Sequence, residues 1–331
     1  MTSASNSTYV YASAENSGIY RLSPGANQWE ELTQGLPGNP IVPGVAVHPE
    51  NPQVIFAGTQ DGPYRSADRG EHWERLDYPS NGAPVWTFTF RPGDPSVMYL
   101  GTAPGEIYRS RDGGDSWQNL NAGMGSNECA MAFPTRVIAL TVDPTNPEDI
   151  YAAIEVAGVI RSSDGGDTWE EITGSLASDE GTLDLHGIQC TAASPNTVYI
   201  TTRMGPYIGR NRGEEWIPMD LGKFSEITYT RDLTVAPHDP SVMYLSLGAG
   251  ARSSRGALYR SRDQFRTFER IDNGTDAPST MMAVSEDPHA PGHIFCVTRH
   301  GQVYGTLDNG STWTNYQMPE KAKEVRGLAV G

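Results

Sequence analysis

The chain has 331 residues, a formal net charge of −16 and a pI near 4.8. This acidity argues against nucleic acid or an anionic membrane surface as partner, and no stretch approaches the roughly 18 apolar residues of a membrane span. The first residues lack the basic and apolar regions of a secretion signal, so a cytoplasmic location is expected. The cysteines are odd in number and do not indicate a disulfide framework: Cys129, Cys190 and Cys296.

One eight-residue sequence recurs along the chain, and we call it the box. The clearest copies are SADRGEHW (Ser66–Trp73), SRDGGDSW (Ser110–Trp117) and SSDGGDTW (Ser162–Trp169). Degraded copies end at four further aromatic residues: LSPGANQW at Trp29, GRNRGEEW at Trp216, SRDQFRTF at Phe268 and TLDNGSTW at Trp313. The closing aromatics lie about 47 residues apart, and the step from Trp313 through the termini to Trp29 has the same length. This fixed period predicts a repeat architecture.

Each repeat contains four short strand-like runs, separated by Gly, Pro and Asp turns and without helical periodicity. First-strand runs follow one another as GVAVH (44–48), VIALTV (137–142), DLTVA (232–236) and VRGLAVG (325–331). The run at 9–13 instead matches a second strand, so the two ends of the chain would share a blade and remove two open sheet edges. The sequence therefore predicts an all-β fold with one domain over residues 1–331. That domain is a seven-bladed β-propeller of four-stranded antiparallel blades, closed by pairing of the N- and C-terminal strands.

The box resembles the Asp-box (BNR) repeat of sialidases, sortilins, two-propeller xyloglucanases and a photosystem II assembly factor. Its aspartate would accept turn N–H bonds, its glycine permits a positive φ, and its tryptophan packs between blades. The aspartates recur at one position and are therefore interpreted as structural: Asp68, Asp112, Asp164, Asp263 and Asp308. The resemblance implies the propeller fold, and function has to be sought in residues that do not repeat.

The arginines form two groups. One group recurs in the third strand and is interpreted as structural: Arg21, Arg65, Arg109, Arg161 and Arg260. The other lies where a first strand begins or a second strand ends, opposite the boxes at the channel mouth: Arg136, Arg203, Arg231, Arg252, Arg255, Arg299 and Arg326. Alignment of the first strands places Trp86, Arg231 and Arg326 at one position, and the residues after the second strands include Glu15 and Glu155.

These non-repeating arginines predict an anion site, because the guanidinium fork binds carboxylate or phosphate in bidentate fashion. The predicted substrate-binding set comprises the seven mouth arginines with Trp86 and Glu15. Resemblance to sialidases implies a similar arginine cluster, but their tyrosine nucleophile and acid loop are not found. The alternative is that the arginines pair with carboxylates on the same rim: Glu15, Asp61, Glu106, Glu155 and Asp184.

Proton transfer is assigned to His186, Glu155 and His300, because a histidine beside carboxylates can act as a general base. No cofactor is predicted. The alternative is a divalent metal at the mouth, held by the two histidines with Glu155 or Asp184, although no short His spacing supports it. An insertion at 121–136 carries Cys129 and, like the segment 223–229, is expected to overhang the mouth.

Three functional hypotheses follow. The main one is an intracellular hydrolase, lyase or isomerase acting on a small carboxylate-bearing molecule, with arginines stabilising the developing negative charge. The second is a BNR-type glycoside hydrolase, which needs two carboxylates roughly 5–10 Å apart. The third is a non-catalytic propeller scaffold that binds a protein or peptide at the channel mouth.

Overall fold

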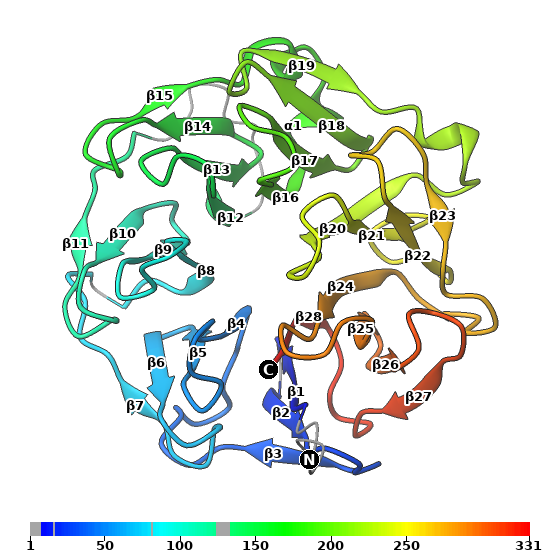
Figure 1. Cartoon of the computed structure of the whole chain (residues 1–331). Coiled ribbons are helices and arrows are strands. Elements are labelled where there is room, and N and C mark those ends of the chain that lie inside the picture. The colour runs from blue at the N-terminus through cyan, green and yellow to red at the C-terminus, as the bar shows by residue number, and fades with distance from the viewer. Residues whose placement is uncertain (1–7, 16, 81, 124–132) are drawn as a thin grey trace, which may run out of the picture.

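The molecule is a ring of seven four-stranded antiparallel sheets around a central channel (Figure 1). The structure is a computed structural model that describes residues 8–15, 17–80, 82–123 and 133–331. The predicted seven-bladed β-propeller is therefore confirmed, including the blade shared by the two ends of the chain. The predicted loop cysteine, Cys129, lies outside the described residues, whereas Cys190 and Cys296 are buried free thiols.

Each blade runs from an inner strand beside the channel to a short outer strand. The first blade comprises β28 (Val325–Val330), β1 (Val10–Ala14), β2 (Gly18–Leu22) and β3 (Trp29–Leu32). The second comprises β4 (Gly44–Val47), β5 (Ile55–Thr59), β6 (Gly62–Ser66) and β7 (Glu74–Arg75). The third comprises β8 (Val85–Phe90), β9 (Met98–Thr102), β10 (Ile107–Ser110) and β11 (Gln118–Asn119). The fourth comprises β12 (Arg136–Val142), β13 (Ile150–Glu155), β14 (Gly158–Ser162) and β15 (Glu170–Glu171).

The last three blades follow the same order and carry the short helical turns. The fifth comprises β16 (Leu185–Cys190), β17 (Val198–Thr202), β18 (Gly205–Arg210) and β19 (Glu215–Pro218). The sixth comprises β20 (Tyr229–Val235), β21 (Met243–Gly248), β22 (Gly256–Ser261) and β23 (Glu269–Arg270). The seventh comprises β24 (Met281–Glu286), β25 (Ile294–Thr298), β26 (Gln302–Thr306) and β27 (Thr314–Gln317). The helical turns lie between blades: η1 (Gly174–Ser178), α1 (Glu180–Leu183) and η2 (Leu221–Lys223).

The ring is closed by main-chain hydrogen bonds between the two ends of the chain. Strand β1 pairs antiparallel with β28, with Val10 opposite Val330. Beyond that pair, the Tyr9 N–H donates to the Gly331 carbonyl at 2.9 Å and the Gly331 N–H donates to the Tyr9 carbonyl at 3.0 Å. Strands β1 and β28 accordingly lie in one blade (Figure 1). This pairing places β1 between β28 and β2, so β1 is not an open sheet edge.

The oxygens of the box aspartate accept hydrogen bonds from residues of the same turn. Asp164 accepts hydrogen bonds from the Thr168 N–H at 2.8 Å and the Thr168 hydroxyl at 2.6 Å, while Ser162 donates to it at 2.8 Å. Gly166, at φ +100°, lies against Leu120 of the preceding blade, so a side chain there would be strained and would meet that leucine. With its oxygens engaged inside the turn, this carboxylate serves the scaffold.

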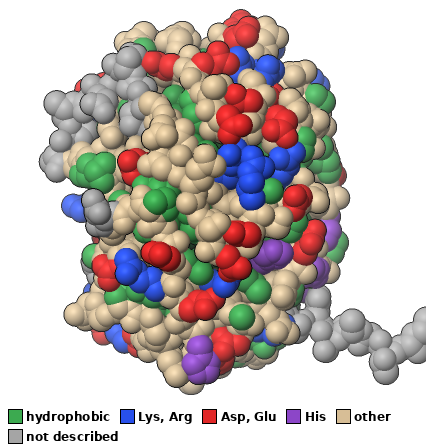
Figure 2. Space-filling model, turned by 90° about the vertical axis from the view of Figure 1, so that its left-hand side faces the viewer, with side chains coloured by type: hydrophobic (Ala, Val, Ile, Leu, Met, Phe, Trp, Pro, Cys, Tyr) green, Lys and Arg blue, Asp and Glu red, His purple; other side chains and the backbone are tan. Residues whose placement is uncertain are grey.

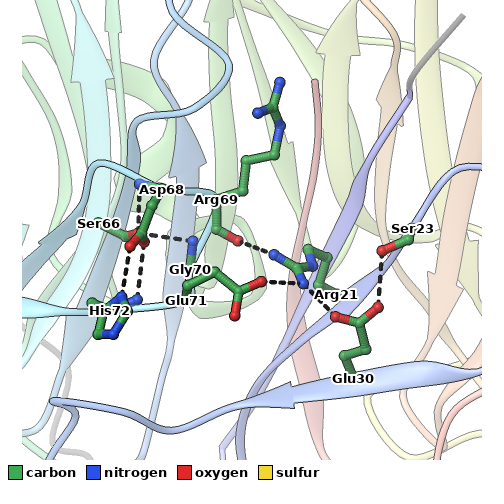
Figure 3. A network of polar contacts seen from close by, with 9 residues as sticks. All are labelled: Arg21, Ser23, Glu30, Ser66, Asp68, Arg69, Gly70, Glu71 and His72. Atoms are coloured by element: carbon green, nitrogen blue, oxygen red, sulfur yellow. Dashed lines mark hydrogen bonds and ion pairs between the residues drawn. The ribbon is translucent and has the colours of Figure 1, made fainter.

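Neighbouring blades are joined by the repeating third-strand arginines, in a contact that we call the arginine clamp. Arg21 of the first blade donates to the Arg69 carbonyl in the second blade's box at 2.9 Å and pairs with Glu71 there at 2.6 Å, while also pairing with Glu30 of its own outer strand (Figure 3). Equivalent bonds run from four other arginines to the next box: Arg65 to Gly113, Arg109 to Gly165, Arg161 to Arg212 and Arg260 to Asn309.

Two junctions have no clamp, because the arginine position holds another residue. In the fifth blade this position holds Ile208, which lies opposite Ile217 of the outer strand. In the seventh blade it holds Gly305, opposite Thr314. Ile208 packs in an apolar cluster with the sixth blade's box, which has Phe265 at its glycine position. At the junction of the fifth and sixth blades, apolar contact therefore takes the place of the charged bridge.

Acidic and basic side chains are interspersed on the flank of the ring, over the outer strands β11 and β15 (Figure 2). The apolar core lies between the blades, in clusters that each draw on adjacent sheets. No helix in the described part of the chain is long and apolar enough to cross a membrane.

The box carboxylates make stability depend on pH in a defined direction. Hydrogen bonds from Thr168 and Thr312 hold the pKa of Asp164 and of Asp308 at about 2. Because these folded-state values lie below the ordinary value of 3.8, the stabilisation is complete above pH 4 and is lost as pH falls toward 2. The Tm should therefore drop steeply over this range. Asp164→Asn/Asp308→Asn should start with a lower Tm and lose less of it; an equally steep drop would contradict this.

Removing one clamp should destabilise the fold. Arg109 is buried and bonded to the Gly165 carbonyl at 2.7 Å, so Arg109→Ala leaves that carbonyl without the bond. We expect a loss of about 1–3 kcal/mol in the free energy of unfolding, measured by urea denaturation. The control is Arg111→Ala, an exposed neighbour, for which a change within about 0.5 kcal/mol is expected. Equal effects of the two substitutions would contradict a special role for the clamp.

Candidate functional site

The side chains at the channel mouth differ between blades, in part because of β-bulges in the inner strands. In six blades the pairing of the inner strand with its neighbour skips one residue. The six skipped residues are Trp86, Ile138, His186, Arg231, Met282 and Arg326. All six line a central cavity of about 330 Å³. A bulge changes the direction of one side chain without disturbing the other hydrogen bonds between the two strands. The residue type at these positions can therefore differ between blades while the scaffold stays the same.

Arg136 is enclosed by aromatic rings and a carboxylate. Its guanidinium lies 4.2 Å from the centre of the Trp86 ring and 4.0 Å from that of Phe133, and it forms an ion pair with Glu155. Burial lowers the pKa of Arg136 and raises that of Glu155, against the opposing effect of their mutual attraction. The geometry holds Arg136 in place on three sides.

Two other predicted anion-binding arginines are also paired with carboxylates. Arg326 donates to Glu15 at 2.6 and 2.9 Å. Arg299 is buried, pairs with Glu324, and donates to the Ala251 carbonyl at 2.7 Å. The rim is therefore charge-balanced at Arg326 and Arg299, and also at Arg136 when Glu155 is ionised. The structure therefore has the rim pairing that was the alternative to an anion site.

A buried histidine contacts one of the rim carboxylates. His186 has Nδ1 2.6 Å from the Thr230 carbonyl, Nε2 3.3 Å from the Tyr229 hydroxyl and Nε2 3.4 Å from Asp184. A carbonyl can only accept, so Nδ1 carries the proton and Nε2 is the acceptor in the neutral ring. Burial and the charge of Arg231 lower the pKa of His186, which keeps the ring neutral near pH 7.

Glu155 and Asp184 lie on adjacent blades, and their pKa values move in opposite directions. The Val156 N–H donates to the Leu183 carbonyl at 2.9 Å, which ties together the segments that carry the two carboxyls. Burial raises the pKa of Glu155, and the negative charge of Asp184 adds to this rise. Burial also favours a higher pKa for Asp184. A proton on the neighbouring His186 ring and the positive charges of Arg203 and Arg231 act against burial and lower this pKa, and the two arginines do so while the ring is neutral. One carboxyl is thus biased toward the protonated form and its neighbour toward the ionised form.

The other predicted residues are spread around the face. Arg231 lines the central cavity, and Arg203 lies 3.9 Å from Asp184. Arg252 is exposed, and Arg255 lies 3.7 Å from Glu226. His300 is exposed in a separate hollow with Gln302, Gln317 and Met318. The structure therefore brings His186, Glu155, Asp184 and Arg231 together and leaves His300 and Arg252 outside this group.

The suggested metal site has no support in the described ranges. No group of three or more His, Cys, Asp and Glu side chains there could hold a metal ion. His186 faces the channel side, whereas His300 lies in the separate hollow, so the two histidines do not converge.

Sequence reasoning missed several residues of the site. Tyr229 hydrogen-bonds to His186, Phe133 covers Arg136, and Ile138 and Met282 complete the ring of bulge residues. Alignment of the first strands found three of the bulge residues, Trp86, Arg231 and Arg326, and missed Ile138 and Met282. Strand β4 pairs with its neighbour without a skipped residue. A search for first strands with one extra residue relative to β4 would have found Ile138 and Met282.

Comparison with known proteins gives relatives of one kind. The chain is 28% identical over 314 residues to Xyloglucanase Xgh74A of Acetivibrio thermocellus, covering 91% of this chain and 32% of that protein. It is 24% identical over 296 residues to the oligoxyloglucan-reducing end-specific xyloglucanase of Emericella nidulans, covering 84% and 32%. It thus spans about a third of the length of these curated relatives, and no family model matches it.

Solved structures support the same fold. The GH74 xyloglucanase from Xanthomonas campestris superposes with a TM-score of 0.66 at 19% identity, over 96% of this chain and 52% of that one. These findings contradict the prediction of a small anionic substrate, because the relatives are named for activity on a polysaccharide. The paired state of Arg299 and Arg326 gives the physical reason, since carboxylates of the rim already neutralise their charges.

Proposed function

We propose that this chain acts as a glycoside hydrolase on a polysaccharide, with its reacting groups on the channel-mouth face. One observation carries the proposal: the Val156–Leu183 main-chain bond brings together two carboxyls on adjacent blades, Glu155 and Asp184, whose pKa values are displaced in opposite directions. Glycoside hydrolysis requires such a pair, one carboxyl to protonate the leaving oxygen and one carboxylate to attack or to activate water. The xyloglucanase relatives support the same class of reaction.

The roles follow from the protonation states. Glu155, whose pKa is raised by burial, donates its proton to the glycosidic oxygen as the bond to the anomeric carbon breaks. Asp184, whose pKa is lowered, stays ionised and supports the positive charge that develops on the sugar ring. Asp184 then either takes a proton from the attacking water or bonds to the anomeric carbon itself. The anomeric configuration of the first product distinguishes these two routes.

The surrounding residues position this pair. Neutral His186 lies against Asp184 while its Nδ1–H donates to the Thr230 carbonyl, which fixes the ring. Arg136 is held between Trp86 and Phe133 and limits how far the pKa of Glu155 rises. The site therefore couples one buried proton donor to an ionised carboxylate with 23% of its side chain exposed.

Removing either carboxyl should abolish hydrolysis. With soluble xyloglucan as substrate, Glu155→Gln and Asp184→Asn should each lower kcat at least about 100-fold, measured as reducing ends released. Glu106→Gln is the control, because this residue lies on the same face but bonds to Tyr108. Thermal unfolding checks that each variant folds. Full activity in Glu155→Gln, or an equal loss of activity in Glu106→Gln, would overturn the assignment of the proton donor.

The pH profile should be bell-shaped, and Arg136 should set its alkaline side. Activity falls at low pH as Asp184 becomes protonated and at high pH as Glu155 ionises. The positive charge of Arg136 lowers the pKa of Glu155, so Arg136→Met should raise that pKa and move the alkaline limb upward. Methionine still fills the space between the two rings. Arg111→Ala should leave the profile unchanged, and a fixed alkaline limb in Arg136→Met would contradict the role of Glu155.

A further inference from the structure

The sixth blade has an elaborated edge on the channel-mouth face. Its loop between β21 and β22 covers 249–255, whereas the corresponding turns at 60–61, 156–157 and 203–204 have two residues each. The linker that precedes β20 adds the turn η2 and the segment 224–228 beside this loop. These two segments depart from the repeat, so the scaffold does not require them.

Two hollows lie between these segments. The first, of about 440 Å³, is lined among others by Phe224, Tyr259, Arg270 and Asp276. The second, of about 630 Å³, is lined among others by Asp184, Arg203 and Tyr229. Glu226, Ile227 and Arg255 line both, so the hollows adjoin across the Arg255–Glu226 ion pair of 3.7 Å. We call the two adjoining hollows the groove, and its second hollow reaches Asp184.

The walls of this groove are fixed before any ligand binds. Thr280 donates to the Gly250 carbonyl at 2.5 Å, and Arg299 donates to the Ala251 carbonyl at 2.7 Å, which pins the loop to the seventh blade. On the other side, Tyr259 donates to the Phe224 carbonyl at 3.3 Å. A preformed groove loses less conformational entropy on binding than a mobile one.

The lining suits a neutral, hydroxyl-rich chain. Each hollow has two acidic and two basic residues, sharing Glu226 and Arg255, with Asp276 and Arg270 in one and Asp184 and Arg203 in the other. This balance disfavours an anionic polymer, which requires excess positive charge. Arg255 and Glu226 are 61% and 91% exposed and offer hydrogen-bonding groups, while Phe224 offers an exposed aromatic surface.

We propose that this groove over the sixth blade holds consecutive sugar units of a neutral polysaccharide and leads the chain to Asp184. The inference rests on the proposed function for its choice of ligand, and it adds where the chain lies and which side chains hold it. Phe224 stacks on a sugar face, and Arg255 and Glu226 bond to hydroxyls at the centre of the groove. Ile227 separates the two hollows and supplies an apolar contact between successive units.

Binding is tested in the Glu155→Gln background, because Glu155 lines neither hollow and its loss blocks turnover. Mobility in native gels that contain xyloglucan, a neutral polysaccharide, or polygalacturonate, an anionic one, reports affinity. Xyloglucan should retard the protein. Phe224→Ala and Arg255→Ala should each weaken this binding about three- to tenfold, the size expected for one lost aromatic or polar contact.

The control is Leu307→Ala, an exposed apolar residue in the seventh blade's box on the opposite face, which should bind as before. Thermal unfolding confirms that the variants fold. Unchanged xyloglucan binding in both groove variants, preference for polygalacturonate, or no binding to either would overturn the groove. If Glu155→Gln still hydrolyses xyloglucan but Phe224→Ala binds it less tightly, the catalytic assignment fails and the groove stands.

Discussion

The contact on which the ring depends most is the third-strand arginine that reaches from one blade into the next box. Arg21 binds a carbonyl and a carboxylate of the second blade together with a carboxylate of its own outer strand (Figure 3). The box turn in turn needs its aspartate to hold that carbonyl in place, as Asp164 does for the Gly165 carbonyl that receives Arg109. Arginine and box are therefore one structural unit, which explains why both recur with the same period.

This dependence also explains what the sequence could predict. The box and its arginine are local, repeated and chemically distinctive, so blade number, strand order and closure follow from the spacing of residues such as Trp73 and Trp117. Pairing of Arg326 with Glu15 and of Arg299 with Glu324 depends on side-chain geometry across blades, which no spacing rule encodes. Arg299 and Arg326 consequently looked like ligands for an anion, although each is bound to a rim carboxylate.

Part of the candidate site could be predicted from the sequence for a related reason. His186 and Glu155 stood out because they break the repeat in polar positions, and the structure places them beside Asp184 and Arg231. Tyr229 and Phe133 did not stand out, because aromatic residues are common throughout the strands. His300 was predicted from its neighbour Arg299, but the turn after β25 directs it into a separate hollow.

The elaborated groove lies at a junction where the clamp is missing, and the two facts are connected. Ile208 replaces the arginine, so the sixth blade's box presents Phe265 and Phe268 to an apolar cluster instead of a carbonyl to a guanidinium. Phe224, at the groove wall, packs edge-on against Phe268 with ring centres 5.5 Å apart. The same aromatic box that joins the fifth and sixth blades therefore anchors the segment that shapes the groove. The apolar cluster that takes the place of the clamp thus also supports Phe224 and Ile227, two of the residues that line the proposed binding surface.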